Sequence, residues 1–152
     1  MRVLIVDDDE QFASGIQMML ESEGYEVRSA KDTQEGYGSY LQFKPDLVLT
    51  DIHMPGGNGL ELMEQIRIHN PMIRTIYMSG DLYDFLSPIE EEKKHYPVSY
   101  LEKPFSRVEL IGLVSELKAW QPAEAEPGSS ATKFETRNKS ELQKDSILTF
   151  KW

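Results

Sequence analysis

Acidic side chains follow two apolar runs of the sequence at the point where each run ends. Asp7 and Asp8 come directly after residues 3–6, and Asp51 directly follows residues 47–50. Short apolar runs bounded by turn residues are typical of buried strands. A carboxylate is poorly tolerated inside such a strand, but the carboxyl end opens onto the rim of the sheet, where ligands bind in open parallel folds. Asp51 is therefore expected at a chemically active position.

If the two runs form neighbouring strands, the carboxylates of Asp7, Asp8 and Asp51 converge. Clustered carboxylates repel one another and raise one another's pKa, and a hard divalent cation removes that conflict. Mg²⁺ prefers one or two carboxylates together with waters and phosphate oxygens, which suits this set. The alternative is that the acidic run 7–10 only caps the following helix and faces its dipole. We prefer that interpretation for Asp9 and Glu10, and both interpretations stay open for the pair before them.

Two further polar side chains are expected on the same rim. Lys103 stands just after the last expected strand and precedes a proline, and Ser79 stands just after the strand before it. A lone lysine is usually a solvated surface charge, but here it could neutralise charge on a ligand oxygen. Ser79 could offer a hydroxyl to that ligand, or it could be a turn residue before Gly80.

Strand and helix patterns alternate along the chain. Five such pairs in strict alternation predict a parallel sheet with helices on both faces. Pro88 interrupts the irregular stretch 82–96, where it would break a helix or begin a new one in its first turn. Apolar residues at helical spacing, or capping residues, predict helices beginning near Glu10, at Asp32 or Thr33, after Asn58 and after Ser106. The expected strands are residues 3–6, 25–29, 47–51, 73–78 and 98–101.

Composition narrows the class of protein. With 152 residues and 39% apolar residues, the chain has room for one globular domain. The net charge is −10, and residues 1–121 carry all of it; this acidity argues against direct binding of nucleic acid. The absence of cysteine excludes disulfides and thiolate chemistry. No apolar run approaches the roughly 18–20 residues of a membrane span, and the amino terminus lacks a signal-peptide pattern. We expect a cytoplasmic protein without a membrane partner.

Four motifs occur in a characteristic order: Val-Leu-Ile-Val-Asp-Asp-Asp, Leu-Val-Leu-Thr-Asp-Ile-His-Met-Pro-Gly-Gly-Asn-Gly-Leu-Glu-Leu, Met-Ser-Gly and Tyr-Leu-Glu-Lys-Pro-Phe. In this order and spacing, residues 1–121 resemble the receiver domains of two-component response regulators. The resemblance implies an α/β, flavodoxin-like, doubly wound sheet of five parallel strands in the order 2-1-3-4-5, with helices on both faces.

The resemblance also implies roles for individual residues around a bound Mg²⁺. Asp51 corresponds to the aspartate that accepts the phosphoryl group. Asp8 corresponds to a direct metal ligand, Asp7 to a partner acting mainly through water, and the main-chain carbonyl of His53 to the remaining protein ligand. Lys103 corresponds to the lysine that pairs with the phosphoryl group.

Other matched positions concern the response to phosphorylation. Ser79 and Tyr100 correspond to the hydroxyl and aromatic residues that switch conformation. His53 and Asp81 occupy the two positions that tune the lifetime of the phosphoryl group in the family. The bond between Lys103 and Pro104 is expected to be cis.

The implied function is a phosphorylation-controlled signalling switch, a phosphoprotein that forms an aspartyl phosphate. It would receive its phosphoryl group from a sensor histidine kinase or a histidine phosphotransfer protein and change its binding face for a downstream protein target. A homodimer is a candidate assembly. The chain is expected not to be an enzyme, beyond catalysing its own phosphorylation and dephosphorylation.

Two alternatives remain open at this point. A phosphatase of the haloacid dehalogenase type would use Asp7 as its nucleophile, because Asp7-Asp8-Asp9 contains an Asp-x-Asp after a strand. However, Gln11 stands where that family usually has Thr or Val. A receiver-like adaptor independent of phosphate is the other alternative, and the complete set of matched polar residues counts against it.

The sequence beyond the expected domain differs in composition. We expect residues 1–121 to form the receiver domain and residues 122–152 to form a linker and a C-terminal tail, which makes this a receiver of the stand-alone type. The tail ends in an apolar group that we expect to dock on a sheet edge or on a second copy: Ile147, Leu148, Phe150 and Trp152. Within the domain, the charged run 90–94 is expected to be a solvated helix face.

Overall fold

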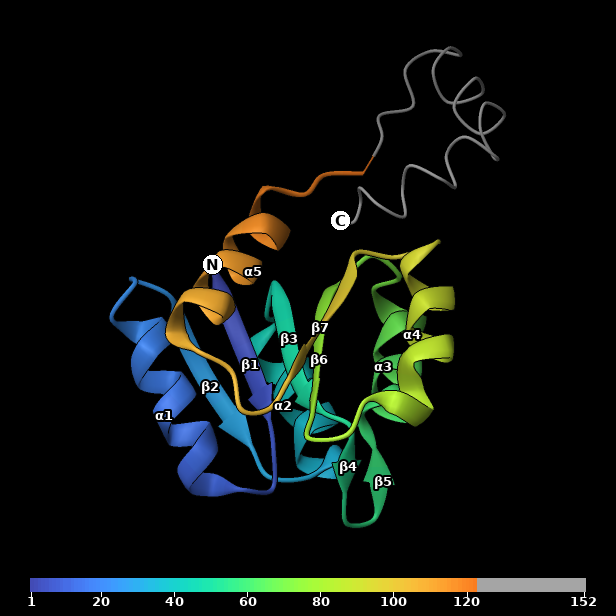
Figure 1. Ribbon diagram of the computed structural model, residues 1–152, viewed down its shortest axis with the longest axis horizontal. Helices are drawn as coiled ribbons and strands as arrows, with labels where there is room; N and C mark the ends of the chain where they lie inside the picture. The colour runs from blue at the N-terminus through green and yellow to red at the C-terminus, as the bar shows by residue number, and fades with distance from the viewer. Residues whose placement is uncertain (123–152) are drawn as a thin grey trace. The chain divides into compact units, whose positions relative to one another are not determined.

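The computed structural model describes residues 1–122 and contains a five-stranded parallel sheet with helices on both faces (Figure 1). The strands lie in the order β2-β1-β3-β6-β7. Counted along the chain, this is the order 2-1-3-4-5 that the motifs imply, so the predicted fold is confirmed. The strands are β1 (Arg2–Val6), β2 (Glu26–Ala30), β3 (Leu47–Asp51), β6 (Arg74–Ser79) and β7 (Val98–Glu102).

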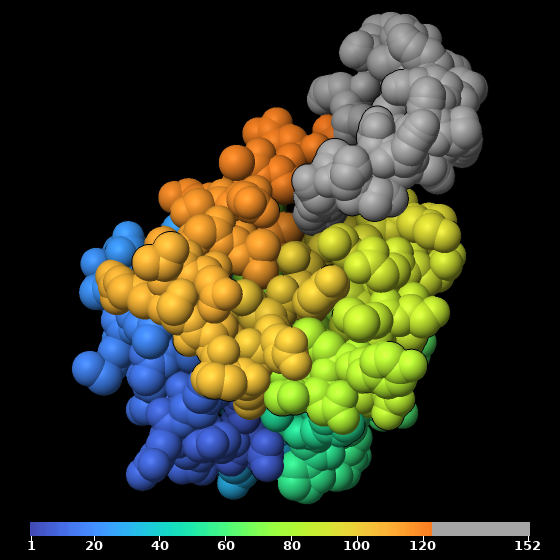
Figure 2. All heavy atoms as spheres, in the orientation of Figure 1, coloured from blue at the N-terminus to red at the C-terminus, as the bar shows by residue number. Residues whose placement is uncertain are grey.

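The helices divide between the two faces of the sheet. In Figure 1, α1 and α5 lie on one face, while α2, α3 and α4 cover the other. Figure 2 shows that α4, in yellow-green, and α5, in orange, both reach the surface on the side of the molecule facing the viewer. The helices are α1 (Glu10–Glu21), α2 (Thr33–Phe43), α3 (Gly59–His69), α4 (Leu86–Lys93) and α5 (Arg107–Ala119), and a 3-10 helix, η1 (Tyr83–Phe85), precedes α4.

The two strands that precede or carry the acidic residues, β1 and β3, lie in the buried interior of the sheet. All of β3 is buried, and so is all of β1 except its first residue. Strands covered on both faces read as continuous apolar runs, which explains why short apolar runs bounded by turn residues located them. The edge strand β2 is more exposed, and its sequence accordingly alternates.

Several helices start only a few residues after the carboxyl end of a strand, and a capping side chain stands just before the first residue of each. Asp9 accepts a hydrogen bond from the backbone N–H of Phe12 at 3.0 Å, and Asn58 forms a reciprocal capping box with Glu61 at the start of α3. Ser106 caps α5, as expected. These short connections leave the preceding strand ends at the rim of the sheet.

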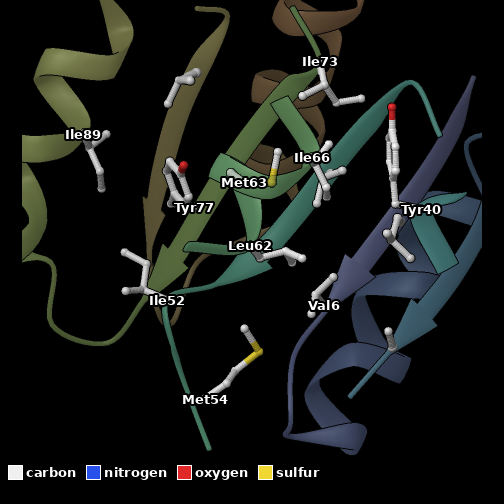
Figure 3. Close-up of a cluster of buried hydrophobic side chains, with 14 of the residues drawn as sticks. Val6, Tyr40, Ile52, Met54, Leu62, Met63, Ile66, Ile73, Tyr77 and Ile89 are labelled. Carbon is white, nitrogen blue, oxygen red and sulfur yellow. The ribbon is translucent and has the colours of Figure 1, made fainter. Parts of the chain in front are cut away.

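The main apolar cluster lies between the sheet and the helices α2, α3 and α4. Figure 3 shows Leu62 and Ile66 of α3 packed over the strands, with Ile89 of α4 pointing toward Tyr77 of β6. Side chains alternate between the faces of a strand, so Val3 and Ile5 point to the opposite face, where α1 and α5 lie.

Two connections between the strands and helices contain short elements. The segment after β3 forms an antiparallel hairpin of β4 (His53–Met54) and β5 (Gly57–Asn58), which periodicity does not reveal because each strand has two residues. Pro88 is the third residue of α4, which agrees with a new helix beginning around the proline, because first-turn N–H groups have no partner within the helix.

The prediction of a solvated face for residues 90–94 is wrong for Glu92. Its side chain is only 19% exposed and forms an ion pair with Arg67 of α3. The predicted linker and tail lie, apart from residue 122, outside the described residues, and so does the predicted docking of the tail. Across residues 1–122, no helix has both the length and the apolar character that crossing a membrane requires.

Candidate phosphoryl and metal site

The acidic residues meet at the carboxyl ends of β1 and β3. These strands are neighbours with Val6 paired to Thr50, so Asp7 and Asp51 lie side by side on the rim. Ligand oxygens of Asp7, Asp8 and Asp51 lie within 4.8 Å of one another. Asp7 and Asp51 are 1% and 7% exposed, whereas Asp8 is open to solvent. The convergence expected from the strand ends is therefore present.

Backbone N–H groups orient the two buried carboxylates. Asp7 Oδ1 accepts a hydrogen bond from the N–H of Asp9 at 2.9 Å, and Asp51 Oδ1 accepts one from the N–H of Ile52 at 3.0 Å. The N–H of Asp7 in turn donates to the carbonyl of Ala30 at 3.0 Å, which extends the pairing between β1 and β2 up to the site. Asp7 and Asp51 are thus fixed by the ends of the sheet itself.

Lys103 is the cation closest to the buried acids in the described part of the chain. Its Nζ lies 2.9 Å from Asp7 Oδ2 and 3.6 Å from Asp51 Oδ1. The ring centroid of Phe12 lies 4.3 Å from the same Nζ, and Phe12 meets Phe105 edge to face at 5.6 Å. The lysine is therefore positioned by acids on one side and by an aromatic ring on another. The peptide bond between Lys103 and Pro104 is cis, as expected.

The electrostatics of the site disfavour a charge on Asp51. Burial, followed by the charge on Asp7, raises the pKa of the Asp51 carboxyl from 3.8 to about 6, although Lys103 and the N–H of Ile52 oppose the shift. The donor set fits a hard divalent ion, because it offers carboxylate oxygens of which one side remains open to water and to further oxygen ligands. An ion of charge +2 would also offset the repulsion that raises this pKa.

The start of α3 packs directly behind Asp51. A Cβ added to Gly59 would lie 2.4 Å from the backbone carbonyl oxygen of Asp51, a distance that no side chain can accept. The N–H of Gly59 donates to the carbonyl of Ile52 at 3.0 Å. This close approach of helix and strand requires glycine and fixes the backbone on which the acidic side chain is mounted.

Ser79 lies at the rim, but its hydroxyl is engaged with its own turn. The hydroxyl donates to the carbonyl of Asp81 and accepts from the N–H of Asp81, each at 3.0 Å. The carbonyl of Ser79 accepts a hydrogen bond from the N–H of Lys103 at 2.8 Å, which links the ends of β6 and β7. The turn role expected for Ser79 is therefore present, whereas a contact between its hydroxyl and a ligand stays a prediction.

The side chains of Tyr100 and His53 contact α4 and the segment before it. Tyr100 is half-buried on β7, is hydrogen-bonded to Glu90, and its pKa is raised by burial and then by that carboxylate. The ring of His53, an exposed residue of the hairpin, packs edge to face on Phe85 at 4.9 Å.

The structure brings together the predicted residues Asp7, Asp8, Asp51 and Lys103. Sequence reasoning missed the positions of Phe12 and Gly59. Phe12 lies in the helix expected to begin near Glu10, and nothing in its spacing distinguishes a core residue from one that also contacts Lys103. Gly59 follows the capping residue Asn58, and a glycine inside the first turn of a helix, where it is unfavourable, was the available signal.

Comparison with known proteins identifies the family. Residues 3–115 match the model of the response regulator receiver domain. Over 99% of its length the chain is 32% identical to the transcriptional regulatory protein PdtaR of Mycobacterium tuberculosis, of which it covers 79%. It is 29% identical to the sporulation initiation phosphotransferase F of Bacillus subtilis, with 76% of this chain and 91% of that protein covered.

A solved structure agrees with these sequence relatives. The response regulator TrrA from Thermotoga maritima, solved in complex with Mg²⁺ and BeF, superimposes with a TM-score of 0.66 at 29% identity, covering 76% of this chain and 97% of that one. Fold and acidic rim together define a receiver module of two-component signalling. The chain belongs to the response regulator receiver family, and it is a phosphorylation-controlled signalling switch. The comparisons favour neither the phosphatase nor the adaptor alternative.

Proposed function

We propose that Asp51 is the residue that accepts the phosphoryl group. The observation that carries the proposal is the convergence of Asp51 with Asp7 and Asp8 within 4.8 Å, with Lys103 Nζ at 3.6 Å from Asp51. Asp51 is a buried carboxylate at a strand end, so its nucleophilic oxygen has a defined direction. Asp7 is already paired with Lys103 and with a backbone N–H, and Asp8 is solvated, so neither competes as well for this role.

The proposed ligands of Mg²⁺ are the carboxylates of Asp7, Asp8 and Asp51 and the main-chain carbonyl of His53. A bound Mg²⁺ supplies charge neutralisation for the clustered carboxylates and for the phosphoryl oxygens. The acidic cluster supports this assignment because three carboxylates share one nearby lysine.

The reaction is an in-line displacement at phosphorus. The Asp51 carboxylate attacks the phosphorus of a phosphohistidine on the partner; the new P–O bond forms as the P–N bond breaks, and the electron pair stays on the imidazole nitrogen. Lys103 holds a phosphoryl oxygen, as its position next to Asp51 favours. The N–H of Ile52 keeps the other carboxylate oxygen oriented.

Ser79 and Tyr100 are the proposed switch residues. The Ser79 hydroxyl would exchange its bonds with the Asp81 backbone for a bond to the new phosphoryl group. Tyr100 would then turn inward and leave Glu90, changing the surface formed by α4, β7 and α5. His53 and Asp81, which flank the site, are proposed to tune the lifetime of the acyl phosphate.

The proposed partners follow from the reaction. The phosphoryl donor is a sensor histidine kinase or a histidine phosphotransfer protein, and the output is contact with a downstream protein or with a second copy of the chain. The net acidity supports protein partners rather than nucleic acid. We assign the receiver domain to residues 1–121 and the linker and tail to residues 122–152, in a cytoplasmic protein whose catalysis is limited to its own phosphorylation and dephosphorylation.

Intact mass after incubation with a small-molecule phosphodonor tests the acceptor. We expect the native chain to gain one phosphoryl group in the presence of Mg²⁺ and to gain none with a chelator. Asp51→Asn should gain none in either condition, whereas the control Asp84→Asn, at an exposed position, should behave as the native chain. A phosphoryl group retained on Asp51→Asn would move the nucleophile to another residue, with Asp7 the first to examine.

A further inference from the structure

An aromatic ring lies against the ammonium group of the lysine at the acidic rim. Lys103 Nζ lies over the ring of Phe12, 4.3 Å from its centroid. The face of an aromatic ring carries partial negative charge and attracts a cation. The Lys103 side chain is only 20% exposed, so water weakens this attraction less than it would on an open surface. The ring is therefore an electrostatic partner of the lysine as well as a packed side chain.

The position of the ring depends on the same acid that the lysine contacts. The N–H of Asp9 donates to Asp7 Oδ1 at 2.9 Å, and the N–H of Phe12 donates to Asp9 Oδ1 at 3.0 Å in the first turn of α1. Lys103 Nζ in turn lies 2.9 Å from Asp7 Oδ2. These contacts form a closed series that begins and ends at Asp7. The ring and the acid are thus fixed relative to each other, with the ammonium group in contact with both.

The segment that carries the lysine is held at its backbone and packs on the same ring. The N–H of Lys103 donates to the carbonyl of Ser79 at 2.8 Å. Phe105, two residues beyond the lysine, meets Phe12 edge to face at a centroid distance of 5.6 Å. The remaining freedom lies in the flexible four-carbon stem of the lysine. The contacts of Nζ therefore decide where its charge is held.

A ring holds this ammonium group differently from a further carboxylate. A lysine ammonium has three N–H donors. One donates to Asp7 Oδ2 at 2.9 Å, whereas Asp51 Oδ1, at 3.6 Å from Nζ, lies beyond hydrogen-bond length. The ring attracts the charge as a whole and has no carboxylate oxygen that would fix an N–H in one direction. N–H groups of Lys103 therefore remain available to an oxygen that binds beside Asp51.

We propose that Phe12 is a positioning residue for Lys103. Its ring holds the ammonium group beside Asp7, close to Asp51 but not hydrogen-bonded to it, so that the lysine can donate to the incoming phosphoryl group. Without the ring, the long side chain samples other rotamers, including one that pairs tightly with Asp51 and occupies the nucleophile. This inference rests on the proposed function, in which Asp51 accepts the phosphoryl group and Lys103 holds one of its oxygens.

The rate at which a small-molecule phosphodonor phosphorylates the full chain, followed by intact mass at saturating Mg²⁺, tests the proposal. Incorporating trifluorophenylalanine at residue 12 nearly keeps the shape of the ring but withdraws the negative charge from its face. We expect this chain to react about threefold to tenfold more slowly than the native chain. Phe12→Tyr, which keeps an aromatic face, should react at the native rate. A native rate with trifluorophenylalanine would overturn the proposal.

Phe12→Leu removes the ring, keeps an apolar side chain and should slow the reaction by a similar factor. Phe43→Leu is the matched control, because the Phe43 ring also lies against cations, with the guanidinium groups of Arg28 and Arg2 at 4.6 and 5.5 Å. Arg2 begins β1, whose other end precedes Asp7. Phe43→Leu should therefore react at the native rate even where it lowers the melting temperature. Equal slowing by both substitutions would attribute the effect to lost packing and refute the positioning role.

A double-mutant cycle separates an action through the lysine from an action on α1. Lys103→Gln should react more slowly than the native chain, and adding Phe12→Leu to it should slow the reaction no further. A further reduction as large as in the native background would show that the ring supports the helix and not the lysine, against the proposal.

The outcomes also separate this inference from the proposed function. If Lys103→Gln is slow while Phe12→Leu reacts at the native rate, only the positioning role fails. If Lys103→Gln reacts at the native rate, the proposed role of Lys103 fails and the positioning role fails with it. A phosphoryl group retained on Asp51→Asn would overturn the acceptor assignment and this inference together.

Discussion

Ionising Asp51 places a negative charge in a poorly hydrated position beside Asp7. The carboxyl therefore titrates near pH 6 rather than 3.8. Because the pKa is higher in the folded than in the unfolded chain, the folded protein binds the proton more tightly. Stability contributed by this group is present below about pH 4 and is lost as the pH rises through 6. At 1.36 kcal/mol per pKa unit, the loss amounts to at most about 3 kcal/mol.

Asp51→Asn should therefore stabilise the metal-free protein at neutral pH. We expect its free energy of unfolding at pH 7.5, with a chelator present, to exceed that of the native chain by about 1–3 kcal/mol, and the difference to vanish near pH 4. Urea unfolding across this pH range measures it. Asp84→Asn, at an exposed position, should show no such trend. A stability gain that does not change with pH would contradict the electrostatic explanation.

At the scale of elements, the approach of α3 to β3 decides the geometry behind Asp51. The helix begins where a glycine lets its backbone come within contact of the strand, and a Cβ at Gly59 would lie 2.4 Å from the Asp51 carbonyl oxygen. The acidic side chain is thus supported by a backbone contact that involves no charge. Moving the helix would displace the strand end that carries Asp51.

Gly59→Ala should lower stability and phosphorylation together. Backbone has to shift to admit the methyl group, so we expect a loss of about 1–3 kcal/mol, as for an overpacked core. Chemical denaturation and the mass assay described above measure the two effects. Gly112→Ala, in α5 with nothing within 4 Å of the added Cβ, is the matched control and should stabilise the protein by up to about 1 kcal/mol through helix propensity. If Gly59→Ala left the free energy of unfolding unchanged, α3 would be able to shift and admit the methyl group without loss of stability.

The sequence locates the ends of the strands, but not the contacts between residues far apart in the chain. The common location of Asp7, Asp51 and Lys103 was predictable. The end of a strand can be recognised from neighbouring residues in the sequence, and the carboxyl ends of parallel strands lie at one rim of the sheet. The ion pair of Arg67 with Glu92 was not predictable, because those residues lie 25 positions apart and each alone looks like a solvated helix charge. One feature of the sequence did indicate that Arg67 is buried. Arg67 follows Met63 by one helical turn and so lies on the buried face of α3. The hairpin of β4 and β5 is too short to produce any period.

At the scale of the whole molecule, the protein carries ten more negative than positive formal charges, and some of the repulsion is concentrated at one rim. A divalent ion that binds the folded chain there and not the unfolded chain stabilises the fold by mass action. Binding of such an ion at the rim would therefore couple metal concentration to the stability of the entire domain.

Mg²⁺ should raise the melting temperature of the native chain. At about ten times its dissociation constant the gain is roughly 1.4 kcal/mol, which corresponds to a few degrees for a protein of this size. Differential scanning calorimetry with and without Mg²⁺ measures it. The increase should be lost in Asp8→Asn and kept in Asp84→Asn. An increase of equal size in both variants would indicate general screening rather than a site.

The ion pair of Lys103 with Asp7 joins residues 96 positions apart. Asp7 directly follows β1, and Lys103 directly follows β7, which is made after the other four strands of the five-stranded sheet and occupies one of its edges. A nascent chain that still lacks β7 therefore carries its acidic residues without the lysine that pairs with them. We therefore expect the rim with both its acids and its lysine to form only after most of the domain has been synthesised.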